Sequence, residues 1–335
     1  MRGNAYVQLS GVVLLWAVNI VLVKVALSDA PPMALTCLRF AGGVVLFGAI
    51  AWVLGIPLVP RPNERLALAA IGIVQFGLVS AFSAAGLSFV PAGRASVLLY
   101  TMQIWALPLG YWIGNDQPTR TRVLGVAVAS IGLVGFLGPW LVDWSDRRTI
   151  VGYAILIGTA ILWAFGSCLY RARSWQTPSL TQIIWQIAFS AGVLACLSMV
   201  FESGHPIRWT SLVWVMLVFN WIAGTVLAYW WWAGALKIMP ASQAGQFATL
   251  VPVVVFLLSV GLLGEDLSLG VLTSALMILM GIIITARTPA PARSASGKAS
   301  QWSRGLRRRW ARLLGRSWPA PASFWLRQAA RDPPS

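Results

Sequence analysis

Two basic side chains lie inside long apolar segments of the sequence, Lys24 in the segment 6–27 and Arg39 in the segment 33–54. A charge at the centre of a bilayer costs at least ~2.5–3.5 kcal/mol, so an ionisable residue in such a segment indicates a functional role. At a rise of about 1.5 Å per residue, Arg39 lies roughly 10 Å from the nearer end of its helix, and Lys24 lies within about one turn of an end. We expect Arg39 to bind an anionic ligand group, with capping of backbone carbonyls as the alternative. Lys24 is a second candidate, with snorkelling to the membrane surface as its alternative.

The acidic residues have a different distribution, because all nine lie in loops, at helix ends or in the C-terminal tail. Two of them, Asp116 and Glu265, are expected at the ends of apolar helices. Proteins that relay protons across a membrane usually place Asp or Glu within the spans. A proton relay through a carboxylate inside a span is therefore disfavoured, whereas uniport, exchange and proton entry through a helix-end acid such as Glu265 stay open.

Polar and aromatic residues of the apolar segments are candidates for the wall of a ligand cavity: Trp16, Asn19, Tyr100, Gln103, Trp163 and Gln246. A buried amide needs a hydrogen-bond partner, which either a ligand or a neighbouring helix supplies, so bonds between helices are the alternative for each of them. Pro108 and Pro252 lie within the fourth and ninth expected spans. Proline removes a backbone donor, so we expect both to weaken their helices and act as hinges.

Enzymatic chemistry has little support in the sequence. The chain has three cysteines, all in apolar segments, and one histidine, His205, in an expected loop. A catalytic dyad or a metal site needs partners that these residues lack. No paired acid, histidine or nucleophile set that faces one cavity is visible, so we predict no enzyme activity, no metal and no cofactor.

The elements that position these residues follow from the composition, which is 58% hydrophobic and 10% charged with a mean hydropathy of +0.75. A soluble domain usually carries about 25% charged residues. A span needs roughly 20 apolar residues. Turn and charge patterns divide the apolar region into ten spans, so we predict an all-α polytopic membrane protein. The spans are expected at 6–27, 33–54, 66–88, 92–113, 121–141, 150–170, 180–201, 211–235, 241–263 and 268–286.

An internal repeat relates the two halves of this region. Leu15-Trp16-Ala17 recurs 147 residues later as Leu162-Trp163-Ala164, and Phe89-Val90-Pro91-Ala92 is similar to Ile238-Met239-Pro240-Ala241 at an offset of 149. The repeats are expected at 6–141 and 150–286. Each has five spans, so the second must enter the membrane inverted relative to the first. Inverted repeats are typical of secondary transporters, in which the substrate lies near the midplane between the halves.

The formal charge of +16 comes mostly from the tail 287–335, which contains eleven basic residues and one acidic residue. Loop charges favour cytoplasmic termini, with Asp116 on the inside and Glu265 on the outside. The tail is expected to be partly disordered, with an amphipathic helix at 302–316 that binds anionic lipids. A wholly disordered tail that only enforces topology is the alternative, and nucleic-acid binding is disfavoured. Arginine outnumbers lysine 22 to 3, which is typical of a GC-rich bacterial genome and indicates the bacterial inner membrane.

Two segments carry a resemblance to a known family. The run LLWAVNIVLVKVAL…PPMALTCLRF from Leu14 to Phe40 resembles the opening of an EamA domain of the drug/metabolite transporter superfamily. The run IMPASQAGQFATLVPVVVFLLSVGLLGEDLS from Ile238 to Ser268 is similar to the fourth helix of that domain. The resemblance covers residues 6–286 and implies a transporter, often an exporter, of amino acids, other metabolites or drugs. A lipid-carrier flippase and a non-transporting scaffold are the alternatives. The first half has Gln103 where the second has Pro252, so the halves are not expected to contribute equally to the site.

Overall fold

The computed structural model describes residues 2–114, 119–137, 145–236, 247–265 and 268–287. Every regular element in these ranges is helical, which confirms the prediction of an all-α polytopic membrane protein. Six helices are long and apolar enough to cross a membrane: Ala5–Ala26, Pro32–Val53, Pro62–Phe89, Arg147–Arg171, Ser179–Phe201 and Ser211–Trp232. The expected amphipathic helix 302–316 and nearly all of the basic tail lie outside the described residues.

The first five spans contain ten helical elements. Continuous α-helices form the first, second and fifth spans, whereas the third and fourth are composite and include π-helical segments. In chain order the elements are α1 (Arg2–Ala26), α2 (Pro32–Val53), η1 (Pro62–Glu64), α3 (Arg65–Gly72), η2 (Ile73–Leu78), α4 (Val79–Phe89), α5 (Ala92–Tyr100), α6 (Met102–Leu109), η3 (Gly110–Gly114) and α7 (Arg120–Phe136), where η1 is a short 3-10 turn that precedes α3.

The second five spans repeat this organisation. The sixth, seventh and tenth spans are continuous, and the eighth contains a π-helical segment. The elements are α8 (Arg147–Arg171), α9 (Ser179–Phe201), α10 (Ser211–Phe219), η4 (Asn220–Leu227), α11 (Ala228–Leu236), α13 (Val251–Leu263) and α14 (Leu269–Arg287).

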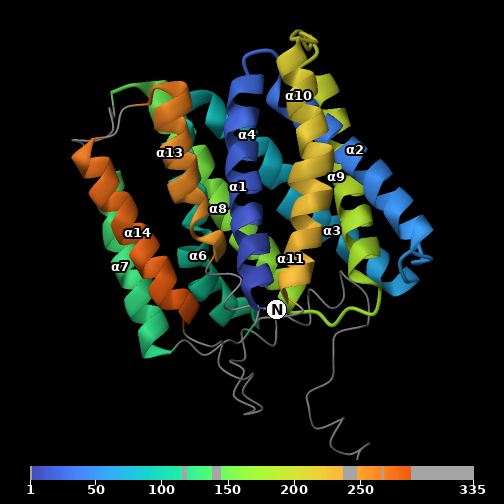
Figure 1. Cartoon of the computed structure of the whole chain (residues 1–335), viewed down its shortest axis with the longest axis horizontal. Coiled ribbons are helices and arrows are strands. Elements are labelled where there is room, and N and C mark those ends of the chain that lie inside the picture. Colours follow the sequence, from blue (N-terminus) through green and yellow to red (C-terminus); the bar gives the residue numbers. More distant parts are fainter. Residues whose placement is uncertain (1, 115–118, 138–144, 237–246, 266–267, 288–335) are drawn as a thin grey trace, which may run out of the picture.

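Corresponding spans of the two halves run in opposite directions. In Figure 1 the third span rises from α3 to α4, whereas the corresponding eighth span descends from α10 to α11. The same view places the N-terminus at the lower end of α1, and we call this side the N-terminal face and the opposite side the far face. The antiparallel course of equivalent spans is the inverted arrangement that an odd number of spans per repeat requires.

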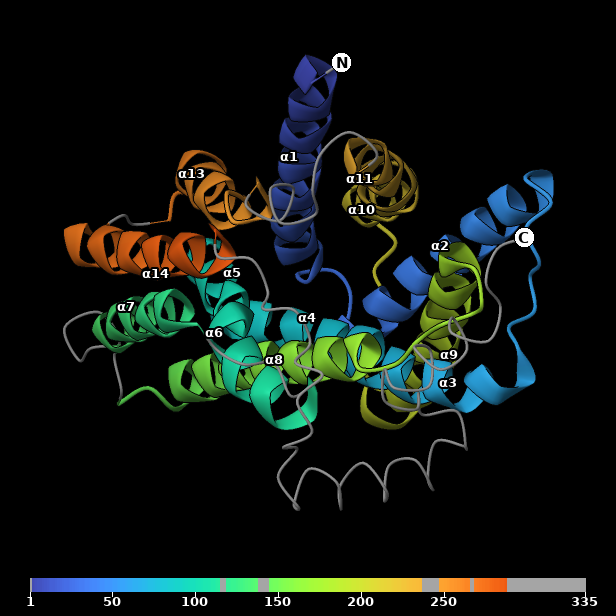
Figure 2. The ribbon, with the colours of Figure 1, turned by 90° about the horizontal axis from the view of Figure 1, so that it is seen from below.

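Two tightly packed helix pairs form the lateral edges of the molecule. The pair α7–α14 lies at one edge and the pair α2–α9 at the other, as both views show (Figures 1 and 2). Each pair joins one span of the first half to one of the second. In α7–α14 the backbones meet at Gly125 and Gly281, because a Cβ on either glycine would collide with backbone atoms of the other helix. Small residues permit such close packing in membranes, where lipid removes the hydrophobic drive for association.

Departures from α-helix occur at equivalent positions in the third and eighth spans and in the fourth and ninth spans. The segment η3 is an exception, because the equivalent residues 259–263 belong to the α-helix α13. The π-helical segments η2 and η4 begin at Ile73 and Asn220, which are 147 residues apart. In the fourth span the amide of Thr101 donates to Leu98 O over 3.1 Å, and in the ninth the amide of Leu250 donates to Phe247 O over 2.9 Å, 149 residues later. Both bonds close a tight turn that interrupts the span. These offsets match those of the sequence repeat, so the irregularities belong to the repeated unit. Turns of π-helix are rare and frequently lie at functional sites.

Three glutamates join the halves through helix N-termini. Glu202 accepts hydrogen bonds from the amides of Met33 (2.8 Å) and Ala34 (2.9 Å) at the start of α2. Glu265 accepts from Ala92 (2.6 Å) and Gly93 (3.0 Å) at the start of α5. The amides at a helix N-terminus lack partners within the helix, and the helix dipole favours a negative charge there.

The third glutamate, Glu64, lies on the N-terminal face and is 2% exposed. Its carboxylate accepts from the amides of Gln176 (2.8 Å) and Thr177 (3.0 Å), just before α9. All three carboxylates therefore bind backbone of the opposite half, and none of them is free to receive a ligand.

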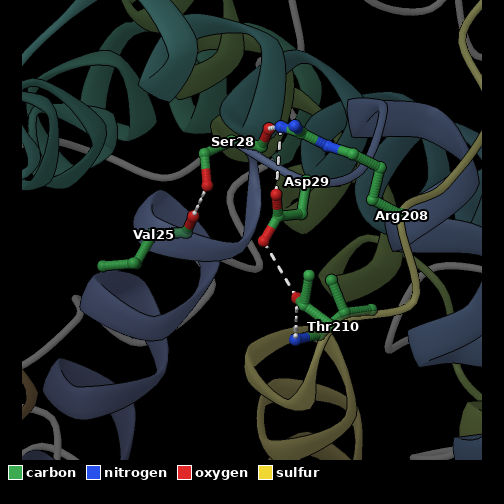
Figure 3. A network of polar contacts seen from close by, with 6 residues as sticks. Val25, Ser28, Asp29, Arg208 and Thr210 are labelled. Atoms are coloured by element: carbon green, nitrogen blue, oxygen red, sulfur yellow. Dashed lines mark hydrogen bonds and ion pairs between the residues drawn. The ribbon is translucent and has the colours of Figure 1, made fainter.

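A polar network links the same halves at the far face (Figure 3). Asp29, between α1 and α2, forms an ion pair with Arg208 over 3.0 Å and accepts a hydrogen bond from the Thr210 hydroxyl over 2.9 Å. Arg208 also donates to Ser28 O over 2.5 Å, and its amide donates to Asp29 O over 2.8 Å. The loop that follows α1 is thus bonded to the chain that precedes α10.

Replacing Glu202 with alanine is expected to lower the free energy of unfolding by about 1–3 kcal/mol, because two partly buried amides lose their acceptor. Unfolding of the detergent-solubilised protein measures the change. The matched control is Asp146→Ala, since Asp146 also accepts from two amides, those of Arg148 and Thr149, but within its own exposed helix start. We expect a smaller loss for the control. Equal losses would contradict the role of Glu202 as a link between the halves.

Candidate functional site

A cavity of about 650 Å³ lies among the spans of both halves. Eight spans contribute to its wall, the first to fourth and the sixth to ninth. Cavities of roughly 300–1,000 Å³ with mostly apolar walls and a few polar groups are typical sites for small organic molecules. The wall fits that description, with these polar members: Asn19, Arg39, Ser80, Ser83, Tyr100, Gln103, Thr159, Asn220, Thr225, Tyr229 and Thr249.

The interrupted fourth and ninth spans both reach this cavity. Tyr100 and Gln103 lie on either side of the turn at Thr101, and both line the wall, whereas Thr101 itself does not. In the same way Thr249 and Val251 lie on either side of Leu250 and line the wall. Where a helix is interrupted inside the membrane, backbone donors and acceptors become available to a ligand. The repeat thus supplies two interrupted helices to one cavity.

Arg39 contributes the positive charge of the cavity. Its Nε donates to Asn220 Oδ1 over 2.9 Å. Within the part of the chain that the structure describes, Arg39 is the only charged residue of the wall and forms no ion pair. The five described carboxylates are engaged elsewhere: Asp29, Glu64, Asp146, Glu202 and Glu265. A guanidinium in the membrane without a carboxylate partner is costly, so an anion in the cavity would be stabilised.

Asn19 contributes an unused acceptor. Its Oδ1 is buried and has no hydrogen-bond partner among the described residues, although the side chain lines the cavity. A buried amide oxygen without a donor costs free energy that a ligand N–H or O–H would recover. Arg39 and Asn19 together offer a donor for an anionic group and an acceptor for a polar hydrogen.

Aromatic pairs between the halves form much of the apolar wall. The rings of Trp16 and Trp232 are 5.6 Å apart, and those of Phe76 and Trp163 are 6.2 Å apart, measured between centroids. In each pair one ring comes from the first half and one from the second. The first span therefore contacts the eighth, and the sixth contacts the third, as the inverted relationship requires.

The structure gathers six residues named from the sequence around one cavity: Trp16, Asn19, Arg39, Tyr100, Gln103 and Trp163. Lys24 is not among the residues of the wall. Its Nζ donates to the carbonyl oxygens of Leu87 and, over 3.0 Å, Val90, where α4 ends. Helix carbonyls at a C-terminus attract a cation, so Lys24 caps α4 instead of facing a ligand. Gln246 and Asp116 lie outside the described residues, and Glu265 binds the start of α5.

The two prolines occupy different local settings. Pro108 lies inside α6, seven residues after the turn at Thr101 and two residues before the start of η3. Pro252 lies in the first turn of α13, immediately after the interruption at Thr249–Leu250. Proline is well tolerated in the first turn, because the amide it lacks has no partner there. The interruption of the fourth span thus lies at Thr101, away from Pro108.

Asn220 is the main site residue that the sequence analysis missed. It is 3% exposed, lines the cavity and is the first residue of η4. A lone asparagine within the apolar segment 211–235 resembles Asn19 in the first span, and this similarity could have marked it. Among the described residues, no group of three or more His, Cys, Asp or Glu could hold a metal ion.

Comparison with known proteins places this geometry in context. Residues 4–138 and 150–287 each match the model of the EamA-like transporter family. A crystal structure of a protein that is 19% identical superposes with a TM-score of 0.60 and covers 86% of this chain and 100% of its own. At that identity the superposition shows a shared fold.

Curated relatives extend along most of the chain. The uncharacterized transporter YoaV of Bacillus subtilis is 25% identical over 283 residues, which cover 83% of this chain and 94% of the relative. A probable amino-acid metabolite efflux pump of Salmonella typhimurium is 26% identical over 287 residues, which cover 82% and 91%. A protein of the same description from Escherichia coli is 24% identical over 287 residues.

Proposed function

Because the chain belongs to the EamA-like transporter family, we propose that it exports a small carboxylate-bearing metabolite, such as an amino acid or a related compound, across the bacterial inner membrane. The family is one of transporters and not of enzymes, and the chain is a multi-pass membrane protein with bacterial relatives. The proposal concerns three further points: the nature of the substrate, the direction of transport and the orientation of the termini.

The observation that carries the proposal is the uncompensated charge of Arg39 in the cavity. A guanidinium presents N–H donors in a planar fork that matches a carboxylate. Arg39 uses its Nε for Asn220, and no described carboxylate pairs with it. A substrate carboxylate would neutralise the charge, while Trp16, Trp163 and their ring partners would contact an apolar side chain.

Two further features support this choice of substrate and mechanism. Two relatives that align over most of their length are described as probable amino-acid metabolite efflux pumps. In addition, the cavity lies between inverted halves and receives two interrupted spans, which suits alternating access around a fixed site. An amino acid also carries an ammonium group, for which the free Oδ1 of Asn19 is a suitable acceptor.

Counterflow in proteoliposomes tests the proposal. Vesicles that contain the purified protein are loaded with one unlabelled amino acid at a time, and accumulation of the same labelled amino acid is followed against protein-free vesicles. We expect saturable accumulation for at least one amino acid and much weaker accumulation of its carboxamide. Equal accumulation of acid and amide across the panel would contradict a carboxylate-binding site.

The orientation is a separate prediction. Val59 and Gly204 are exposed in equivalent loops, after the second and the seventh span. In a variant without native cysteines, an impermeant maleimide applied to intact cells should label a cysteine at position 204 and not one at position 59, since inverted repeats place these loops on opposite sides. Labelling of both positions would contradict the inversion, and labelling of position 59 alone would reverse the orientation.

A further inference from the structure

The guanidinium of Arg39 is held by a residue of the other repeat. Arg39 belongs to α2 in the first repeat, and its Nε donates to Oδ1 of Asn220, which begins η4 in the second repeat. Asn220 is itself fixed, because its Nδ2 donates to Met216 O over 3.0 Å. Arginine can only donate and a carbonyl can only accept, so both bonds require the same orientation of the amide.

This bond determines which part of Arg39 faces the cavity. The guanidinium carries five N–H donors in one plane. With Nε directed at Asn220, the two terminal nitrogens are left for a ligand, and in that geometry they can engage both oxygens of a carboxylate. Without Asn220 the side chain would keep its charge but lose the bond that defines its plane.

A second contact holds η4 against α2 at the same level. The indole Nε1 of Trp221 donates to Leu38 O over 3.1 Å, and its ring occupies the space beside Gly42. Consecutive residues of η4 therefore bond to consecutive residues of α2, Asn220 to Arg39 and Trp221 to Leu38. Trp221 attaches the helix without contacting the guanidinium, and it does not line the cavity.

We propose that Asn220 is the positioning residue that gives Arg39 its selectivity for a carboxylate, so that the charge of the first repeat is directed by the π-helical segment of the second. The inference rests on the proposed role of Arg39 in binding the substrate anion. It adds that anion selectivity depends on both repeats, and that a movement of η4 during the transport cycle changes how Arg39 is presented.

The test measures a selectivity ratio, which packing damage alone does not move. Dissociation constants are determined in detergent for the amino acid with the largest counterflow signal and for its carboxamide. Asn220→Ala is expected to lower the preference for the acid roughly tenfold, since a hydrogen bond to a charged group is lost. Asn220→Asp is expected to lower it further, because a carboxylate beside Arg39 competes with that of the ligand. Trp221→Phe, which removes the neighbouring bond, should leave the ratio unchanged.

A double-mutant cycle with Arg39→Gln separates the two claims. If Asn220 acts through Arg39, then Asn220→Ala has no further effect on the ratio in the Arg39→Gln background. Suppose that Arg39→Gln alone lowers the ratio. If Asn220→Ala then changes the ratio equally with Arg39 and with Gln at position 39, or changes it in neither case, the positioning role is overturned and the proposed function stands. If Arg39→Gln alone leaves the ratio unchanged, the proposed function falls and the positioning role falls with it.

Discussion

Replacing Arg39 with glutamine should weaken binding of the carboxylate-bearing substrate by about 10- to 100-fold and change binding of its neutral amide little. A hydrogen bond to a charged group contributes roughly 1.5–3 kcal/mol. Each 1.4 kcal/mol is a factor of ten in the dissociation constant. Arg39 is the only charged side chain of the cavity among the described residues, so no neighbour there can replace it. Glutamine keeps a polar amide, while it removes the positive charge and shortens the side chain.

The matched control is Lys24→Gln. It also removes a positive charge from the first repeat, but Lys24 bonds to carbonyl oxygens at the end of α4 and does not line the cavity. We expect the ratio of acid to amide affinity to stay unchanged in this variant, although its stability falls. Binding titrations on the detergent-solubilised proteins measure both ratios. An unchanged ratio in folded Arg39→Gln protein would show that Arg39 has a structural role.

The contrast between these two residues shows what the sequence could provide. The apolar segments and their turn residues predicted the ten spans, and the second span, for example, was expected at 33–54 and extends over Pro32–Val53. Apolar length and helix-breaking residues are local properties, so they can be read directly. Both in-span charges could be identified in the same way. Which of them lines the cavity could not be predicted, because the partners that hold Lys24 away from it are 63 and 66 residues distant in the sequence.

The shape of the site was beyond local patterns for the same reason. The interruption at Thr101 and the π-helical segments η2 and η4 have no residue-type signature of their own; they occur where spans of opposite halves meet. The interruption at Leu250 differs, because Pro252 lies two residues after it. Proline suggested a hinge at position 108, yet the span is interrupted at Thr101.

The carboxylates make a related point about Glu265. Its place at the end of a span suggested a route for protons, and nothing in the sequence indicated a bonding partner. In the structure it accepts from amides more than 170 residues away. Every described carboxylate accepts hydrogen bonds from the protein or forms an ion pair. Among the described residues, none of these acids lines the cavity.

Replacing Gly281 with valine should prevent stable folding. A Cβ at this position would collide with backbone atoms of Gly125 and Ala129 in α7 and would approach Ala129 Cβ within 2.7 Å. Backbone atoms cannot rotate away as a side chain can, so α7 and α14 would have to separate along much of their length. Overpacking of this kind usually costs 1–3 kcal/mol when side chains can adjust, and we expect about 3 kcal/mol or more here.

Gly261→Val provides the matched control, since the same side chain is added to a glycine of the neighbouring ninth span. No heavy atom lies within 4 Å of a Cβ at Gly261, so the new side chain meets open space. The free energy of unfolding should then change by no more than about 0.5 kcal/mol. Thermal unfolding and the monodisperse yield after purification compare the two variants. Similar stabilities would mean that the α7–α14 pair is looser than the backbone contact indicates, and that these edge helices can separate during transport. A large difference would confirm that α14 packs against the backbone of α7 at Gly281.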